Sequence, residues 1–358
     1  MKFIQKIAMF CVVLVVFLEL FFRFVMPVAE KPAYFMDPAT KLVLFDAEFS
    51  SKGTYTWGRF PVDGGDWVLN NQGWLSVFDY KPVEEKVKPR VALLGDSFIA
   101  GLSTDKDTHL DVRLFESFNN SVDFYSFGMG GQYLEQYRVL MEYVDKKFDP
   151  DIYLVFVNSR DIKSSLTTYG KYYLYHQLEP NGGGFKDIAP NYFKESRLKR
   201  LLRRSSLVIY LRLNAGIQLF GGGRGIVDAN ANPDMASGDS DEELDPFLVQ
   251  TADLILDRMV EGRPGKQFVF VGDGHRNLLY KGVSSPQLPE DCRIIQAACS
   301  SRPQCHYLDL MEFFIEDYSQ HGRMFNFVDN YHWNVYGSDL VAEALAGFLK
   351  EKEMLPSS

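Results

Sequence analysis

Five short apolar runs, rich in β-branched and aromatic residues, alternate with longer helical patterns from residue 90 onward. The runs cover residues 91–94, 122–127, 152–157, 268–271 and 306–310, and helix-length stretches such as 133–147 and 245–260 lie between them. Continuous apolar strands that are each followed by a helix are typical of a parallel sheet covered on both faces. The sequence therefore predicts a doubly wound α/β domain, whose ligands bind beyond the carboxyl ends of the strands.

The amino-terminal residues predict a membrane segment. Residues 7–18 carry no charge, Lys2 and Lys6 precede them, and apolar character continues past Glu19 and Arg23 to Val28. This length matches the roughly 20 residues of a bilayer span. An uncleaved anchor is favoured over a cleaved signal peptide, because residues 24–28 offer no small-x-small cleavage site. The basic amino end predicts a cytoplasmic tip, contact with lipid through residues 7–25, and the remaining bulk of the chain in the periplasm.

Charge and cysteine content limit the possible partners. The net charge of -9 argues against nucleic acid, whose binding needs a basic face. Cys292, Cys299 and Cys305 fall within one short stretch, and an oxidising compartment would allow one disulfide among them. Zinc is the weaker interpretation, since their spacing forms no recognised ligand pattern. We therefore expect neither a metal nor a cofactor.

The chain divides into four segments on these patterns. Residues 1–28 form the tip and anchor, 29–89 an aromatic-rich lead-in of β or irregular structure, 90–350 the α/β domain, and 351–358 a tail. An insertion at about 163–243 interrupts the domain and contains a helical pattern rich in arginine, lysine and leucine from residue 197 to 212. An ordinary amphipathic cover helix is the favoured interpretation. Contact with an anionic membrane or an acidic glycan is the alternative.

A Gly-Asp-Ser sequence, Gly95 to Ser97, directly follows the first apolar run. The glycine permits a sharp turn, and a helix beginning near Ser97 would expose the serine hydroxyl and backbone N–H at the positive end of that helix. Alone, such a sequence often marks nothing more than a helix N-cap. Its meaning therefore depends on the residues at the ends of the neighbouring strands.

Potential hydrogen-bond donors come directly after the second and third runs. Residues 126–131 include three glycines, whose missing side chains let backbone N–H groups approach a ligand closely. Asn158 places a side-chain amide after the third run. The backbone N–H groups of Ser97 and a glycine, together with this amide, would make the three-donor oxyanion hole that acyl transfer needs.

Asp329 and His332 stand near the carboxyl end, before a helical pattern over residues 338–350. A carboxylate three residues before a histidine can hold the imidazole and stabilise its charged form, which leaves the other ring nitrogen to take a proton from a serine. The last connection should return to the same sheet edge. Serine, histidine and aspartate are therefore expected to meet there.

These four blocks, in this order, resemble the SGNH (GDSL-like) hydrolase superfamily over about residues 90–350. The resemblance implies a flavodoxin-like three-layer α/β/α sandwich with Ser97 as nucleophile, His332 as base and Asp329 as the partner of that histidine. It also implies Ser97, Gly131 and Asn158 as oxyanion donors.

The third block departs from the family's usual Gly-x-Asn-Asp, because Phe156 and Ser159 stand at its outer positions. Weaker predictions place Asp96, Gly130 and His275 against the substrate.

We expect a membrane-anchored serine esterase or O-acyltransferase that works through an acyl-serine. The anchor and lead-in resemble membrane-tethered members associated with bacterial envelope polysaccharide acylation, which implies an acylated carbohydrate as substrate and possible contact with that machinery. The alternative is a non-catalytic, membrane-tethered glycan-binding or assembly protein on an SGNH fold. The altered third block favours this alternative, and the presence of all of Ser97, Asp329 and His332 argues against it.

Overall fold

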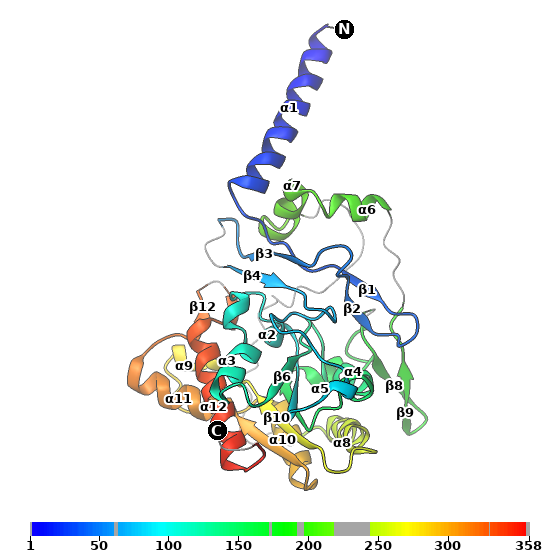
Figure 1. The fold of residues 1–358 in the computed structure, drawn as a ribbon, viewed down its shortest axis with the longest axis vertical. Helices are drawn as coiled ribbons and strands as arrows, with labels where there is room; N and C mark the ends of the chain where they lie inside the picture. Colours follow the sequence, from blue (N-terminus) through cyan, green and yellow to red (C-terminus); the bar gives the residue numbers. More distant parts are fainter. Residues whose placement is uncertain are drawn as a thin grey trace.

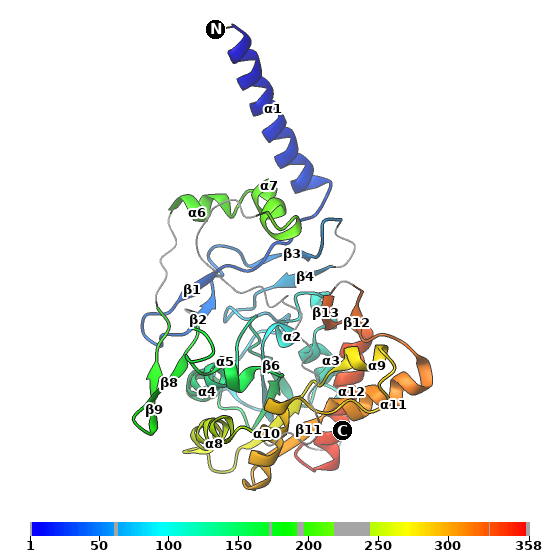
Figure 2. The same ribbon diagram turned by 180° about the vertical axis from the view of Figure 1, so that it is seen from behind.

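A single apolar helix rises from a body made of a parallel sheet and its covering helices (Figure 1). The computed structural model describes residues 2–60, 64–171, 174–191, 197–217, 244–328 and 330–355. The long helix is α1 (Lys2–Phe24), and it projects freely in both Figure 1 and the reverse view of Figure 2. Its length and composition are sufficient to cross a bilayer.

The central sheet has five parallel strands, which confirms the five predicted runs. They are β5 (Arg90–Leu94), β6 (Asp123–Ser126), β7 (Ile152–Val157), β10 (Gln267–Gly272) and β11 (Cys305–Asp309). Their order across the sheet is β6-β5-β7-β10-β11, with parallel pairing throughout. This is the flavodoxin-like order, whose switch point lies between the first and third strands, here β5 and β7.

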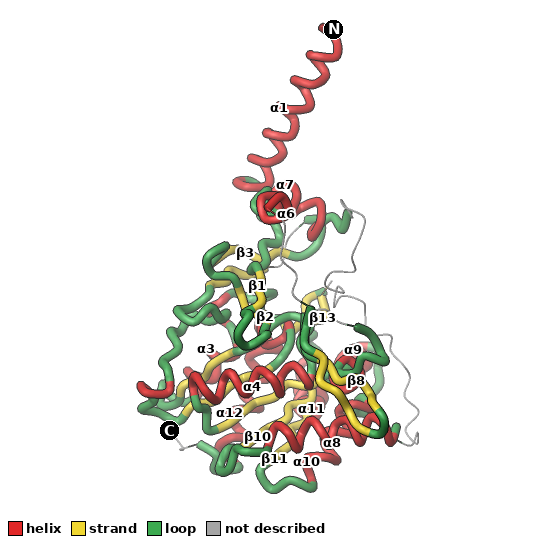
Figure 3. The backbone as a smooth tube through the Cα atoms, turned by 90° about the vertical axis from the view of Figure 1, so that its right-hand side faces the viewer, coloured by secondary structure: helices red, strands yellow, loops and turns green. Residues whose placement is uncertain are grey.

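Helices cover both faces of the sheet, as the continuous apolar strands predict. Val91 and Leu93 of β5 face a core shared with α3 (Leu110–Ser117), α11 (Leu310–His321) and α12 (Val335–Glu351). Ala92 and Leu94 face the opposite core, shared with α4 (Leu134–Phe148), α8 (Pro246–Val260) and α10 (Glu290–Ser300). The three-layer α/β/α sandwich is confirmed, and Figure 3 shows helices along the sheet.

Short elements complete the connections. They are η1 (Val83–Glu85), α2 (Ser97–Ala100), η2 (Lys106–Thr108), α5 (Asp161–Ser164) and α9 (Arg276–Tyr280), and the antiparallel pair β12 (Asn326–Phe327) and β13 (Asn330–Trp333). Of these, α2 and β13 carry the candidate active site.

The lead-in folds into two hairpins, β1 (Tyr34–Met36) with β2 (Val43–Phe45) and β3 (Lys52–Thr56) with β4 (Gly64–Val68). The chain after these hairpins packs on the sheet through aromatic side chains. Trp74 lies edge-on to Phe127 at 5.0 Å between ring centroids. Tyr80 stacks on Tyr125 at 4.0 Å, and its hydroxyl donates to the Ser126 carbonyl. The lead-in and the sheet therefore share one hydrophobic core.

The insertion holds a hairpin, β8 (Gln177–Asn181) with β9 (Gly184–Ile188), that the sequence patterns do not predict. After it come α6 (Arg197–Leu202), α7 (Ser206–Ile209) and the π-helical turn η3 (Tyr210–Asn214). The predicted basic helical pattern is thus two short helices and a turn. Residues 218–243 of the insertion lie outside the described residues.

The four cysteines are free thiols, so the structure does not contain the disulfide that an oxidising compartment would allow. Cys292 turns inward from α10, where its sulfur lies 4.0 Å from the Val157 carbonyl oxygen. The Cys299 and Cys305 thiols act on each other, which raises the pKa of Cys299 and lowers that of Cys305. Within the described ranges, no group of three or more potential metal ligands occurs.

Candidate active site

Ser97 is the first residue of α2, directly beyond the carboxyl end of β5. The preceding Asp96 caps this helix, because its carboxylate accepts a hydrogen bond of 3.0 Å from the Phe98 N–H. A side chain at Gly95 would not fit, since a β-carbon there would lie 2.3 Å from Ile99 Cγ1. The glycine therefore allows the tight turn that brings Ser97 to the sheet edge.

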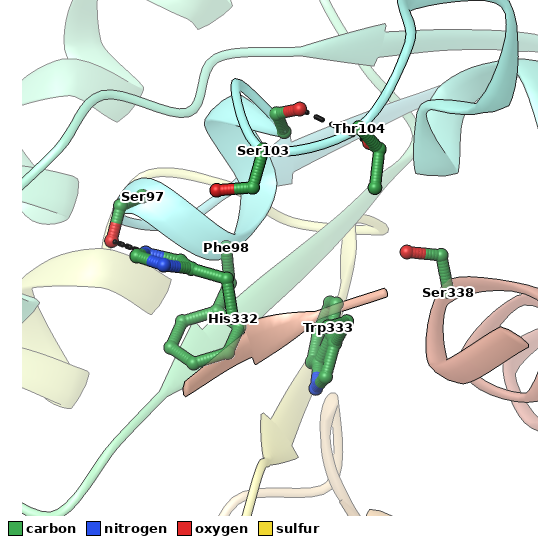
Figure 4. Close-up of a pocket in the computed structure, with 8 residues that line it drawn as sticks. Ser97, Phe98, Ser103, Thr104, His332, Trp333 and Ser338 are labelled. Atoms are coloured by element: carbon green, nitrogen blue, oxygen red, sulfur yellow. Dashed lines mark hydrogen bonds between the residues drawn. The ribbon is translucent and has the colours of Figure 1, made fainter. Parts of the chain in front are cut away.

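His332, on β13, points at this serine. Its Nε2 lies 2.7 Å from Ser97 Oγ, as the dashed line in Figure 4 marks. Its Nδ1 lies 2.5 Å from Asn330 Oδ1, which also accepts the His332 backbone N–H at 3.1 Å. The Asn330 amide nitrogen donates to Ser103 Oγ at 3.0 Å, so the amide oxygen faces the ring. Nδ1 therefore carries the ring proton, and Nε2 is free to accept the proton of Ser97.

Asp329, the predicted partner of His332, lies outside the described residues. In the described part, Asn330 is the side chain that holds Nδ1. Sequence reasoning missed Asn330, because the spacing of Asp329 and His332 directed attention to the carboxylate. An amide oxygen can fix the tautomer of a histidine, although it brings no negative charge to the imidazolium.

The loop after β10 supports β13, the strand that carries His332. Asp273 accepts a hydrogen bond of 2.9 Å from Trp333 Nε1 and pairs with Arg276. Arg276 also donates to the Tyr331 carbonyl at 3.0 Å and lies over the Phe98 ring at 5.4 Å. His275, predicted in this loop as a substrate contact, is the N-cap residue of α9 and half-buried. That role of His275 stays a prediction, whereas Asp273 and Arg276 have the observed positioning contacts.

The surroundings of His332 favour its neutral form. Burial, followed by the positive charges of Arg276 and Lys31, lowers the pKa of His332 to about 3. A neutral imidazole at physiological pH is the state that can accept the serine proton.

The glycine loop after β6 lies beside Ser97. A β-carbon on Gly130 would come within 3.8 Å of the Ser97 β-carbon, and Gly131 has a φ of +78°. Gly128 lies against α2, where a β-carbon would be 2.3 Å from the Ala100 nitrogen. Tyr175, from the insertion, donates to the Gly130 carbonyl at 2.6 Å. The structure thus brings Gly130 close to the serine and fixes the loop from two sides.

Asn158 lies at the same edge, after β7, and its amide contacts Asp96, the residue before Ser97. Its Nδ2 donates to Asp96 Oδ2 at 3.3 Å, and its Oδ1 accepts the Arg160 N–H at 3.1 Å. Burial raises the pKa of Asp96 to about 7, against the lowering effect of the Phe98 N–H, and the negative charge of Asp273 adds to the rise. Asn158 and Asp96 are therefore paired immediately behind Ser97.

Tyr331 is a second residue that sequence reasoning missed. Its ring stacks on His332 at 4.6 Å between centroids, and the Ser97 side chain acts on its hydroxyl by lowering the pKa of that group. Burial raises the pKa of Tyr331 above its ordinary value. It stays protonated at neutral pH and can donate a hydrogen bond beside the nucleophile. No sequence pattern marks it, since its place depends on the β12–β13 hairpin.

Several solved structures are similar to this chain at low sequence identity. A two-domain esterase active on acetylated mannans is 10% identical, with 74% of this chain and 49% of that one covered and a TM-score of 0.39. An acetyl xylan esterase from the rumen bacterium Butyrivibrio proteoclasticus is 10% identical, with coverages of 75% and 64% and a TM-score of 0.34. The lipase/acylhydrolase from Enterococcus faecalis is 11% identical, with coverages of 74% and 96% and a TM-score of 0.38.

The chain spans about half the length of the mannan-active esterase that it matches, 49% in one structure and 51% in the mannopentaose co-crystal. No family model and no curated protein sequence matches the chain.

A small hollow lies beside the serine and histidine. Its volume is about 10 Å³, close to the space of one water molecule. Figure 4 shows Ser97 on one side of the His332 ring, with Ser103 and Ser338 on the other. The hollow is lined by Ser97, Phe98, Gly101, Ser103, Thr104, His332, Trp333 and Ser338.

Proposed function

We propose that the protein is a membrane-anchored serine esterase or O-acyltransferase of the SGNH type. The observation that carries the proposal is the 2.7 Å contact between Ser97 Oγ and His332 Nε2, with the opposite ring nitrogen held by Asn330. A serine hydroxyl that faces a neutral, oriented imidazole is the arrangement of an activated nucleophile.

In the proposed reaction, Ser97 Oγ attacks the acyl carbon of an ester while His332 Nε2 takes the serine proton. The tetrahedral intermediate collapses, its alcohol leaves with the proton from His332, and an acyl-serine remains. A second hydroxyl then attacks this ester and loses its proton to His332, and Ser97 is regenerated. Hydrolysis results when that hydroxyl belongs to water, and acyl transfer results when it belongs to a sugar.

The negative oxygen of the tetrahedral intermediate needs donors. We assign this role to the backbone N–H groups of Ser97 and Gly131 and to the Asn158 amide. Support comes from the glycine loop beside Ser97 and from the hydrogen bond of Asn158 to Asp96, the residue before Ser97. Asn158 would donate its second amide hydrogen, since the first is directed at Asp96. Tyr331, whose ring stacks on His332, offers a further donor to the same region.

The proposed location is the outer face of the cytoplasmic membrane, with α1 retained as an anchor. The carboxyl end of α1 is bonded to the body, because the Glu19 carboxylate accepts hydrogen bonds from Ser205 Oγ at 2.7 Å and from the Ser206 and Leu207 N–H groups at 3.0 Å. Phe22 stacks on Tyr210 at 4.0 Å. Cleavage near residue 28 would remove these contacts, which favours an anchor over a signal peptide.

The proposed substrate class is O-acylated carbohydrate, because an enzyme held at this membrane face meets envelope glycans and their lipid-linked precursors. The resemblance to membrane-tethered members associated with polysaccharide acylation points the same way. The structural neighbours, at TM-scores of 0.34 to 0.41, do not distinguish among glycans.

Full-length protein in detergent, assayed with a chromogenic acetyl ester, tests the proposal. Ser97→Ala should lower kcat by about 10³-fold or more, since it removes the nucleophile. Ser319→Ala, at an exposed position on α11, is the matched control and should leave turnover unchanged. Turnover in the Ser97 variant close to wild type would refute the assignment. Absence of turnover in folded wild-type protein with every ester tried would favour the non-catalytic alternative.

A further inference from the structure

The segment from residue 197 to 217, which we call the collar, is fastened to the lower end of α1. It comprises α6, α7 and η3. Besides the contacts of Glu19 and Phe22, Arg23 donates to the Arg204 carbonyl at 2.8 Å. The collar is also tied to the body, because Asn214 accepts the Ala29 N–H at 2.9 Å and donates to the Gly58 carbonyl at 2.9 Å. It therefore lies at a fixed height, where α1 meets the body.

The collar helices run across the direction of α1. In Figures 1 and 2, α6 and α7 extend sideways between the end of α1 and the strands β3 and β4, and Figure 3 shows the same level from the side. The 23 residues of α1 span about 34 Å at about 1.5 Å per residue, enough to cross a hydrocarbon core of about 30 Å. With α1 upright in a bilayer, α6 and α7 lie parallel to the membrane surface, beside the headgroups.

The collar has the composition of an interfacial segment. It contains six basic residues and no acidic residue, in a chain whose net charge is -9. Exposed aliphatic side chains stand among these cations, with Leu198 64% and Leu201 66% exposed. Leu213 and Ile217 are also exposed, as are Phe24 at the end of α1 and Phe60 beside the collar's Tyr210 contact. The six basic residues are Arg197, Lys199, Arg200, Arg203, Arg204 and Arg212.

Anionic lipid explains this combination better than an acidic glycan does. Cations with long apolar stems can place their charges among lipid phosphates, while the leucines between them enter the boundary of the acyl chains. A soluble acidic glycan would pair with the cations and leave the leucines in water.

We propose that the collar lies in the headgroup layer of an anionic bilayer and sets the height and orientation of the Ser97 site above the membrane. This role rests on the proposed anchoring of α1. Contact at two places, along α1 and across the collar, would prevent the body from swinging about a single helix. The Ser97 site would then meet acyl donors and acyl acceptors at one distance from the lipid surface.

Full-length protein in nanodiscs tests the proposal with an environment-sensitive fluorophore on Leu201→Cys, in a Cys11→Ser background. The other three cysteines are buried. With phosphatidylglycerol present, the emission should shift to the blue, and shallow nitroxide lipids should quench it severalfold more than in discs of phosphatidylcholine alone. Lys199→Gln with Arg212→Gln should reduce the quenching, while the control pair Lys281→Gln with Lys352→Gln should not.

Labelling of native Cys11, exposed on α1, separates the collar from the anchor. A lipid signal at Cys11 with a fully aqueous signal at residue 201 in every disc would overturn the collar proposal and leave the anchor standing. An aqueous signal at both positions would instead refute the anchor. A shift at residue 201 caused by added polygalacturonate, and not by phosphatidylglycerol, would replace lipid by an acidic glycan as the partner.

Discussion

The contact between His332 Nδ1 and Asn330 Oδ1 determines which ring nitrogen faces Ser97. Asn330→Ala should lower kcat by about 10²-fold with KM nearly unchanged, because the ring would lose its preferred tautomer and orientation. Asn330→Asp keeps an acceptor and should recover most of the activity. Steady-state kinetics and a melting curve on each variant make the test.

Asp329→Ala is the comparison for that experiment. The resemblance to the SGNH superfamily implies that the Asp329 carboxylate is the partner of His332. If Asn330→Ala stays within about threefold of wild type while Asp329→Ala loses about 10²-fold or more, the carboxylate is the partner in solution. The Asn330 contact would then be secondary.

Replacement of Asn158 distinguishes two roles for this residue, that of an oxyanion donor and that of a purely structural residue. As a donor to the developing oxyanion, it should give an Asn158→Ala variant with kcat lower by about 10²- to 10³-fold and little change in KM, because that hydrogen bond strengthens only in the transition state. A variant with a lower melting temperature and kcat within about threefold of wild type would show that Asn158 serves only to hold Asp96 and the turn at Arg160.

Ser97 and His332 could be predicted from the sequence, because each belongs to a short block at the end of a predicted strand. Asn330 and Tyr331 could not. Both flank His332, and their contacts with the site depend on the hairpin geometry of β12 and β13. Likewise, Asp273 and Arg276 act through Trp333 and Tyr331, residues some 55 to 60 positions away in the chain. Local patterns do not reveal such contacts.

At the scale of elements, helix α2, which begins at Ser97, depends on close packing against the glycine loop. A β-carbon on Gly128 would lie 2.3 Å from the Ala100 nitrogen and 2.4 Å from the Ile99 carbonyl carbon, which are backbone atoms that cannot turn aside. Gly128→Ala should lower the free energy of unfolding by about 1 to 3 kcal/mol, the usual cost of overpacking. Chemical denaturation measures this change.

Gly347→Ala is the matched control, because a β-carbon there meets nothing within 4 Å and the residue lies inside α12. Helix propensity predicts a gain of about 0.5 to 1 kcal/mol for that variant. Equal stability of the two variants would mean that the loop and α2 are further apart in solution than the structure has them.

The sheet strands and the long helices were predictable because their apolar runs are long and their faces are buried. The β8–β9 hairpin was not, although Asn181 and the three glycines after it form a strong turn signal. Its strands contain Pro180 and charged residues on exposed positions and show no apolar alternation. A turn signal whose flanking residues show no alternation of apolar and polar side chains does not distinguish a hairpin from a loop in a single sequence.

At the scale of the whole molecule, the charges that interrupt the apolar segment have partners in the body. Glu19 and Arg23 weaken the sequence signal for a bilayer span, yet both are bonded to the collar, which the chain reaches more than 180 residues later. Helix α1, the collar and the α/β body thus form a connected structure. That arrangement would keep the Ser97 edge at a constant distance from the membrane.

The central claim is that Ser97 is a nucleophile activated by His332. Intact mass spectrometry of the full-length protein after treatment with a fluorophosphonate measures this most directly. We predict one adduct per chain, located at Ser97 by peptide mapping, absent in Ser97→Ala, at least about 10²-fold slower in His332→Ala, and unchanged in Ser319→Ala. Folded wild-type protein that stays unlabelled, or an adduct that persists in Ser97→Ala, would contradict the account.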